Sequence, residues 1–449
     1  MLFSSAELLW LEKILYERFG CKFELTMQVD QLKLTLIGHE ASIYFDQLQE
    51  VFHRSSSDFP CYQWQALSEG FSSAIEDTIP APSEVELPSP LVEWREQGAV
   101  VHYDILGLSY WMLTRLEEIG RSDLDDHFRF PAVSSHAYKH NYLERPIVDE
   151  WLFILGQVIK RIWPRVSLKQ HSYKVMLSHD VDSPSLYAFK TWYAIGRMMA
   201  GHLLKRHNFK AFVIAPYVKL STRKKLSNYD PHNTFDWLMD VSESNNIKSA
   251  FYFICGRTDR LRDADYEPDH QVIRGLMRRV HERGHELGLH PSYNTYLDPG
   301  LLKGEAQRLK NICEAEDIEQ REWGGRMHYL RWQQSTTMRA WADAGLDYDA
   351  TMGYADRPGF RCGSCWEYTA FDPLAQEVLD LKIRPLIVME CTVIDKIYLG
   401  LGVGRASEDK INLLKERCRQ VGGGFGILWH NSYLMSSKLK VMYKSVIGS

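Results

Sequence analysis

Carboxylate and imidazole side chains follow short apolar runs in the second half of this 449-residue chain. The run Lys174–Leu177 leads into Asp180 and Asp182, and two other apolar runs end in His290 and His430. Two carboxylates spaced two apart can divide a hydrolytic task, because one can bind a divalent cation while the other accepts a proton from the attacking water. A histidine that ends a strand, such as His430, suits a general acid. These residue types point to metal-assisted hydrolysis.

Each of these side chains also has an ordinary structural explanation. Asp residues favour turns and helix starts, so Asp180 and Asp182 could serve a turn. His430 could be a packed core residue. Arg326 follows two glycines and could pair with a catalytic carboxylate and keep it charged, or form a surface or interdomain salt bridge.

Some histidines near residue 285 are candidate metal ligands, and others are expected to be structural. His281 and His285 are four residues apart and could face one way on a helix, like a metal pair. Gly284 is expected to end that helix first, however. We therefore expect His285 to be a structural imidazole and His290, at the end of a strand, to be the better ligand.

These groups need a scaffold that brings the ends of distant strands together. Strand-like stretches follow one another along the second half: 174–182, Ser249–Cys255, Glu286–His290, Pro385–Glu390 and Gly424–His430. Helical stretches alternate with them: Phe235–Asn245, Asp269–Gly284, Pro299–Glu316, Ser335–Ala344 and Asp409–Val421. Repeated strand–helix units predict an α/β barrel or a doubly wound sheet. In a barrel, active sites gather at the carboxyl ends of the strands, where these polar groups lie.

The first part of the chain has a different pattern. Leu8, Leu11, Ile14 and Leu15 fall on one face of an expected amphipathic helix. Further predicted elements are strands within Leu32–Ile43, a loop over Pro80–Pro90, and helices over Asp104–Glu118 and Val148–Ile162. We therefore expect a smaller N-terminal α/β domain, residues 1–170, of unknown role, before a second domain over 171–449.

Composition excludes several classes of protein. With 13 Trp, 23 Tyr and 19 Phe the chain can build a core, so it is not disordered throughout. A net charge of −5 gives no electrostatic footprint for nucleic acid. No apolar stretch approaches the roughly 20 residues that a bilayer requires. Charged residues interrupt the N-terminal helix, which argues against a signal peptide and predicts a cytoplasmic location.

The eight cysteines are scattered, and Cys362 and Cys365 form the only close pair. Free buried thiols are the expected state in a reducing compartment. One such pair without a second is weak evidence for zinc, so we expect a structural role, with a redox or metal role as the alternative.

Taken in order, four motifs resemble those of the polysaccharide deacetylases, the NodB-homology group or carbohydrate esterase family 4. The resemblance covers residues 173–449. The motifs are Ser178–Asp182, the run His290–Asn294 in a G-H-E-[IL]-G-x-H setting, Arg326–Tyr329, and Leu428–His430. The runs Arg145–Glu150 and Tyr348–Tyr354 resemble a divergent branch associated with bacterial surface-polysaccharide genes.

The resemblance implies a fold and a set of roles. The fold would be a distorted (β/α)7 barrel with a divalent metal, expected to be zinc, at the carboxyl ends of the strands. Asp180 would be the general base, with Asp182 and His290 as metal ligands. Arg326 would orient Asp180, the backbone N–H of Tyr329 would help to stabilise the oxyanion, and His430 would protonate the leaving amine.

Two positions depart from the family pattern. The closing His of the second motif is Asn294, and the Pro of the third motif is His328. Catalytic zinc usually has three protein ligands. The third ligand could be His328, which we favour, or Asn294 through its carbonyl oxygen, or another residue such as His179; alternatively, the metal is lost.

The favoured reaction is hydrolysis of an N-acyl group, expected to be acetyl, on a sugar or glycan precursor for a surface polysaccharide. A cytoplasmic location would favour a nucleotide-linked or lipid-linked sugar. One alternative is hydrolysis of another C–N bond, amide or formyl, on the same scaffold. The other is a non-catalytic barrel that binds glycan or a partner in a biosynthetic complex.

Overall fold

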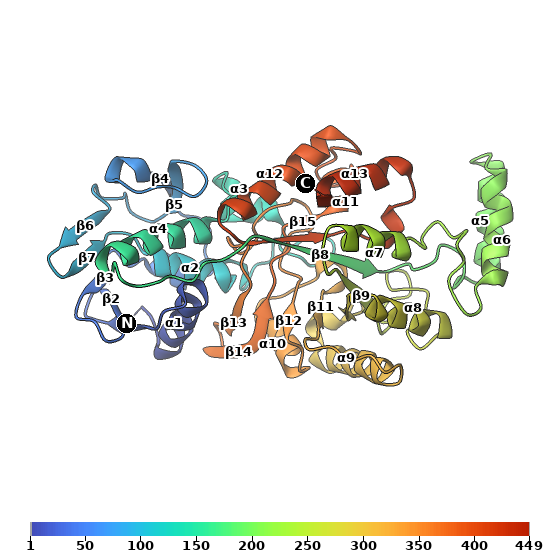
Figure 1. Ribbon diagram of the computed structural model, residues 1–449, viewed down its shortest axis with the longest axis horizontal. Helices are drawn as coiled ribbons and strands as arrows, with labels where there is room; N and C mark the ends of the chain where they lie inside the picture. The colour runs from blue at the N-terminus through green and yellow to red at the C-terminus, as the bar shows by residue number, and fades with distance from the viewer. Residues whose placement is uncertain (1, 449) are drawn as a thin grey trace.

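The molecule is elongated, with three regions in a row (Figure 1). A computed structural model describes residues 2–448. The N-terminal region forms one end, a nine-stranded sheet surrounded by helices occupies the centre, and a pair of helices projects at the other end. No helix within residues 2–448 combines the length and the apolar character needed to cross a bilayer.

The N-terminal region combines a five-stranded sheet with helices. Its strand order is β1–β2–β3–β7–β6, and only β3 and β7 pair in parallel. The elements are α1 (Ser5–Phe19), β1 (Phe23–Met27), β2 (Leu32–Leu36), β3 (Ser42–Phe45), β4 (Cys61–Gln65), β5 (Thr78–Pro82), β6 (Val92–Arg95), β7 (Gly98–Val101), α2 (Ile105–Leu113), α3 (His136–Lys139) and α4 (Ile147–Ile162).

Helix α1 confirms the amphipathic pattern read from the sequence. It begins with a capping box, in which the hydroxyl of Ser4 accepts from the N–H of Glu7 and the Glu7 carboxylate accepts from the N–H of Ser4. Gly20 ends the helix in the left-handed conformation. The expected apolar face is buried at residues 11, 14 and 15, while Leu8 is half-buried.

The loop expected over Pro80–Pro90 is partly wrong. Its first residues belong to β5, which pairs with β4 in an antiparallel two-stranded sheet. Pro80 and Pro82 lie at alternate positions of β5, and proline is tolerated where its missing N–H removes no ladder hydrogen bond. The rest of the segment is irregular, as expected.

The central sheet carries the residues that could do chemistry. Its strand order is β13–β14–β12–β11–β10–β9–β8–β16–β15, and every neighbouring pair is parallel except β13 and β14. The strands are β8 (Lys174–Val181), β9 (Ala250–Ile254), β10 (Glu286–His290), β11 (Gly324–Gly325), β12 (Tyr348–Asp349), β13 (Tyr368–Asp372), β14 (Glu377–Ile383), β15 (Val388–Met389) and β16 (Gly424–Leu428). The predicted strands are thus found, although the last two, β15 and β16, are shorter than expected.

The sheet of the expected distorted (β/α)7 barrel does not close, because no ladder joins its two edge strands, β13 and β15. The segment between β14 and β15 crosses this opening. The N–H groups of Arg384 and Leu386 donate to carbonyls beside β12, whereas the N–H of Ile387 donates to Gly426 of β16. Pro385 has no N–H, so a continuous ladder cannot form through this segment.

The predicted helices around this sheet are confirmed to within a few residues. They are α7 (Phe235–Ser244), α8 (Gln271–Glu282), α9 (Pro299–Glu314), α10 (Thr336–Asp343) and α12 (Arg405–Gln420), to which the structure adds α11 (Glu390–Ile394) and α13 (Ser437–Gly448). Helix α8 shows why they form here: Val272, Leu276 and Val280 repeat every four residues and are buried.

The N-terminal region packs directly on the central sheet. The indole N–H of Trp10 in α1 donates to the backbone oxygen of Thr369 in β13, at 2.9 Å and buried. Arg361 pairs through its guanidinium with Glu118, and both side chains are buried. One continuous apolar cluster includes side chains from both regions. The domain boundary expected near residue 170 stays a prediction.

Candidate active site

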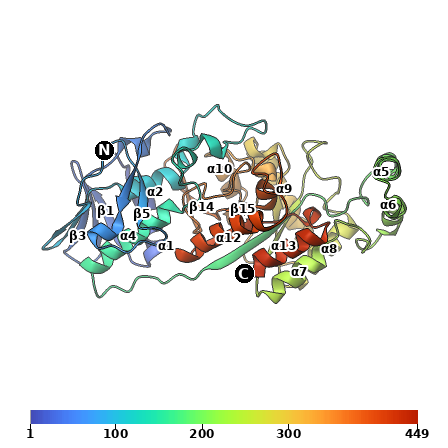
Figure 2. The same ribbon diagram turned by 90° about the horizontal axis from the view of Figure 1, so that it is seen from above.

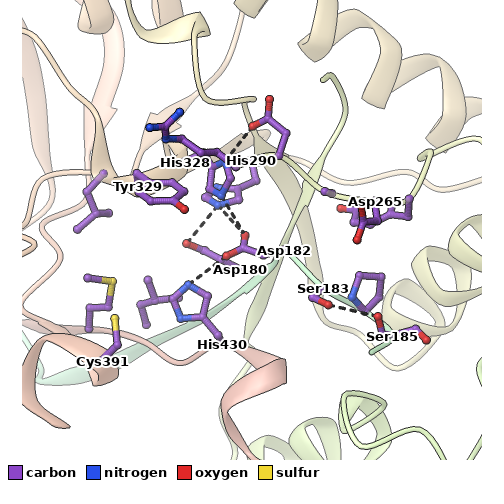
Figure 3. A pocket seen from close by; sticks show the side chains of 18 of the residues that line it. Asp180, Asp182, Ser183, Ser185, Asp265, His290, His328, Tyr329, Cys391 and His430 are labelled. Atoms are coloured by element: carbon purple, nitrogen blue, oxygen red, sulfur yellow. Dashed lines mark hydrogen bonds and ion pairs between the residues drawn. The ribbon is translucent and has the colours of Figure 1, made fainter. Parts of the chain in front are cut away.

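A cavity of about 380 Å³ opens at the carboxyl ends of the parallel strands. Residues from β8, β10 and the segment after β16 line it, together with loop residues. Figure 3 shows His290 and His328 on one side of Asp182 and His430 on the other. The structure thus brings together side chains from all four sequence motifs.

Asp182, His290 and His328 form a group with the geometry of a metal site. One ligand atom from each lies within 4.8 Å of the others. The Oδ1 atom of Asp182 is 3.1 Å from Nε2 of His290 and 3.8 Å from Nε2 of His328. His328 is therefore the third member of the group, as favoured from the sequence.

Both imidazoles are held by hydrogen bonds at their other ring nitrogen. Nδ1 of His290 lies 2.6 Å from the backbone oxygen of Arg326, which can only accept, so Nδ1 carries the proton. Nδ1 of His328 lies 3.1 Å from Oδ1 of the buried Asp263. This arrangement leaves both Nε2 atoms free to bind a cation, and such partners orient metal-binding histidines in general.

Asp263 is a functional candidate that the sequence interpretation missed. Its carboxylate also accepts from the N–H groups of Thr258, Asp259 and Tyr293, which fix its position. Burial acts to raise the pKa of Asp263, but the His328 imidazole and the backbone donors outweigh burial and lower the pKa. The sequence did contain a clue to Asp263. It lies in the loop after β9, which leaves the sheet at the same edge as the motif residues.

The donor set fits a divalent cation such as zinc. Two imidazoles and one carboxylate are the usual ligand number and type of a catalytic zinc site. The Oδ1 atom of Asp182 is buried, and within residues 2–448 the polar groups closest to it include Nε2 of His290 and Nε2 of His328, the two atoms that would share an ion with it. Burial acts to raise the pKa of Asp182, but the imidazoles of His328, His290 and His430 outweigh burial and lower the pKa. The carboxylate therefore stays charged and available as a ligand.

Asp180 is paired with Arg326, as expected. Nη1 of Arg326 donates to Oδ1 of Asp180 at 2.8 Å, and Nη2 donates to the hydroxyl of Ser178 at 2.9 Å. Both charged side chains are buried. Arg326 directly follows β11, where a side chain on Gly325 would collide with the backbone of Leu289 in β10. The close approach of these strands thus places the guanidinium against Asp180.

His430 is paired with a buried carboxylate that the motifs did not reveal. Glu390 accepts from Nδ1 of His430 at 2.6 Å and from its backbone N–H at 2.9 Å. Nε2 of His430 faces Oδ2 of Asp182 at 3.5 Å. Burial acts to lower the pKa of His430, but Glu390 and then Asp182 and Asp180 raise it to about 10. Glu390 ends the predicted strand Pro385–Glu390, so the rule that polar residues ending strands form the site would have found it.

Tyr329 lies at the mouth of the cavity in a tight turn. Its φ of 61° is in the left-handed region, which is uncommon for a residue with a side chain. The guanidinium of Arg129, from the N-terminal region, donates to the backbone oxygen of Tyr329 at 2.8 Å. The ring of Tyr329 also packs against His127, with centroids 4.7 Å apart. The N-terminal region therefore shapes this part of the site.

Two residues considered as the third ligand lie elsewhere. The side chain of Asn294 donates to the backbone oxygen of Thr258, and its oxygen accepts from Arg331. His179 points to the opposite face of β8 from Asp180, where its Nδ1 donates to the backbone oxygen of Trp429. Burial lowers the pKa of His179 to about 3.

Cys362 and Cys365 are buried free thiols, in line with the structural interpretation. Burial raises the pKa of Cys362 to about 11 and that of Cys365 well above its usual value. The N–H of Cys365 donates to the buried carboxylate of Asp149 in α4. Thiols with raised pKa values are poor nucleophiles, so these contacts indicate a packing role.

Comparison with known proteins adds little to this geometry. Residues 5–164 match a family of unknown function, DUF7033. No curated protein matches the chain. A crystal structure described as a polysaccharide deacetylase from Mycobacterium smegmatis is 14% identical, with a TM-score of 0.38, over 62% of this chain and 84% of that one. A crystal structure of Puue allantoinase is 11% identical, with a TM-score of 0.37, over 62% and 83%. Neither likeness is high enough to inform the activity.

Proposed function

We propose that this protein is a metal-dependent hydrolase that removes an N-acyl group, acetyl in the simplest case, from a sugar or glycan precursor. The proposal rests on one observation: a group of three residues and two charged pairs meet at the same cavity. These are the Asp182, His290 and His328 group, the Asp180–Arg326 pair and the His430–Glu390 pair. Together they contain a cation site, a candidate base and a candidate acid.

A zinc or similar ion on Asp182, His290 and His328 would polarise the substrate carbonyl and lower the pKa of a water molecule. Asp180 is the side chain placed to accept the proton of that water. Its Oδ2 atom lies 3.7 Å from Nε2 of His290, the atom that would bind the ion. Arg326 holds the other oxygen of Asp180 and compensates its buried charge.

His430 is the general acid of the proposal. It lies across Asp182 from the two histidine ligands, and Glu390 keeps its imidazole protonated and oriented. The proton on Nε2 can pass to the departing amine nitrogen as the C–N bond breaks. We assign the stabilisation of negative charge on the carbonyl oxygen to the backbone N–H of Tyr329, whose turn Arg129 holds.

A sugar substrate is supported by the wall of the cavity. Tyr329, Tyr398, Tyr266 and Phe189 contribute aromatic surface, and Arg262 and Lys190 contribute hydrogen-bond donors. Aromatic faces with nearby polar groups suit a polyhydroxylated ring. The proposed substrate is a nucleotide-linked or lipid-linked precursor of a surface polysaccharide, acted on in the cytoplasm.

Metal affinity and deacylation together test the proposal. Zinc binding is measured by calorimetry on metal-stripped protein, and acetate release is measured with a panel of N-acetylated sugars. His328→Ala and His290→Ala should each weaken zinc binding by at least about tenfold. Asn294→Ala is the matched control and should leave zinc affinity near that of the native chain.

The outcomes separate the alternatives. Native zinc affinity in His328→Ala would remove His328 from the site. Release of formate or ammonia rather than acetate would identify another C–N substrate on the same scaffold. If the native chain does not bind a divalent cation in a one-to-one ratio, the enzymatic proposal is contradicted and a binding role is favoured.

A further inference from the structure

A helical hairpin projects from the body of the molecule. Helices α5 (Trp192–Leu204) and α6 (Phe209–Ser221) lie side by side at the end opposite the N-terminal region (Figures 1 and 2). Ile195 of α5 is buried with Ala215 and Val218 of α6, and Tyr187 joins them. The two helices thus form a small core of their own, separate from the main apolar cluster.

The outer faces of the hairpin are strongly apolar. Phe209, Val213, Tyr217 and Leu220 are exposed and follow one another at intervals of four, four and three residues, which places them along one face of α6. On α5 the exposed apolar residues are Trp192, Tyr193, Leu203 and Leu204. Tyr193 is 77% exposed, Leu204 73% and Phe209 67%. Exposed apolar residues that cluster in this way indicate an interaction surface, whereas single exposed apolar residues are common on any protein.

The hairpin and the segments on either side of it are also strongly basic, in a chain whose net charge is −5. Residues 183–229 contain no Asp or Glu and have nine basic residues: Lys190, Arg197, Lys205, Arg206, Lys210, Lys219, Arg223, Lys224 and Lys225. Among the ion pairs of residues 2–448, only Lys190 of these nine takes part, with Asp265. Apart from Lys190, these positive charges are therefore not neutralised by ion pairs within residues 2–448.

We propose that this hairpin docks on the surface of an anionic lipid bilayer, lying in the interface without crossing it. Basic side chains are attracted to anionic headgroups, while aromatic and aliphatic side chains enter the boundary with the acyl chains. Tyrosine and tryptophan favour that interface. The exposed aliphatic residues argue against nucleic acid as the occupant, because Leu203, Leu204, Val213 and Leu220 offer neither base stacking nor hydrogen bonds.

A hollow along α5 supplies a place for lipid phosphate. It has a volume of about 420 Å³, and its lining includes Lys190, Arg197, Lys205 and Arg206. Three of these basic side chains, Arg197, Lys205 and Arg206, are available to bind phosphate there, because Lys190 is paired with Asp265.

The hairpin is connected to the candidate active site. The segment that leads from β8 to α5 contributes Ser183, Ser185 and Lys190 to the wall of the cavity. Bilayer docking stands apart from the proposed activity, because it depends only on the surface of the hairpin. Its test therefore needs no substrate and no bound metal.

Co-sedimentation of the full-length chain with lipid vesicles tests the proposal. We expect binding to vesicles of mixed phosphatidylcholine and phosphatidylglycerol, weakened by salt, and little binding to phosphatidylcholine alone. The triple variant Lys205→Glu, Arg206→Glu and Lys210→Glu should bind more than tenfold more weakly, since each basic residue contributes a factor of about five near an anionic surface. Leu204→Ser with Phe209→Ser should also weaken binding by about tenfold or more.

Matched variants outside the hairpin control for charge and for exposed apolar area. Lys303→Glu, Arg405→Glu and Lys438→Glu make the same change in charge, and Leu261→Ser with Val441→Ser removes exposed apolar side chains elsewhere. All four sets should unfold at the native temperature, because the altered residues are exposed. Equal vesicle binding by hairpin and control variants, absence of native binding, or binding only to oligonucleotides would overturn the proposal.

Discussion

Replacing Glu390 by Gln isolates the role of its charge on His430. In the native chain, burial acts to lower the pKa of His430, and the Glu390 charge, 2.6 Å from Nδ1, is the main cause that raises it to about 10. A Gln side chain keeps an oxygen that can accept from Nδ1 and from the backbone N–H. The substitution therefore removes the charge while keeping the geometry.

The size of the effect follows from the ion pair. Loss of an opposite charge in contact moves a pKa by about 1–3 units, so the pKa of His430 should fall to between about 7 and about 9. A general acid is active while protonated, so activity is lost as pH rises through this pKa. At about pH 9, a pKa of about 8 leaves about one tenth of His430 protonated, against about nine tenths for a pKa of about 10. The basic limb of kcat/KM should thus move toward neutral pH, and the two enzymes should converge below about pH 6.5.

The assay is acetate release as a function of pH, with metal content measured in every sample. Asp46→Asn is the matched control, because it removes a carboxylate 2.8 Å from His102, outside the site. This control should keep the native pH profile. A native basic limb in Glu390→Gln would refute the reasoning, since then either Glu390 does not control His430 or His430 is not the acid.

Three further substitutions test other contacts. Asp263→Asn should lower zinc affinity by about 10–100-fold, because its carboxylate orients His328; unchanged affinity in calorimetry would contradict this. Asp180→Asn should retain zinc but lose about 10²–10⁴ in turnover, and near-native turnover would exclude Asp180 as the base. Trp10→Phe leaves a buried backbone carbonyl without its indole donor and should cost about 1–3 kcal/mol in urea unfolding. The exposed Trp192→Phe should change the free energy of unfolding by less than about 0.5 kcal/mol, and equal effects would show that the Trp10 contact is not stabilising.

The sequence predicted the parts of the fold in which apolar residues recur at a regular spacing. Glu286–His290 forms a strand with the predicted bounds, and helix α8 follows its four-residue apolar repeat. The opening of the sheet escaped prediction, because it depends on how the segment around Pro385 meets two distant strands. Helices α5 and α6 were not predicted, since apolar residues occur on both their buried and exposed faces.

The site was predictable where motif residues end strands, and less so elsewhere. Asp182 and His290 follow that rule and meet in the structure at 3.1 Å. The choice between His328 and Asn294 could not be made from spacing, because it depends on which side chain the loops turn toward the strand ends. Asp263 was missed because the sequence places the loop after β9 at the edge of the sheet that carries the site, but does not show which carboxylate of that loop orients a ligand.

The hydrogen bond from Arg129 to Tyr329 makes the first part of the chain a component of the candidate active site rather than an appendage. A shortened protein that begins at the central sheet would lose Arg129 from the lining of its cavity and the support of a turn with an unfavourable φ. Exchange of the N-terminal region between related chains would then alter substrate preference while every motif residue stays in place. The proposed substrate preference could therefore change through Arg129, a residue 200 positions away in sequence from the Tyr329 turn that it contacts.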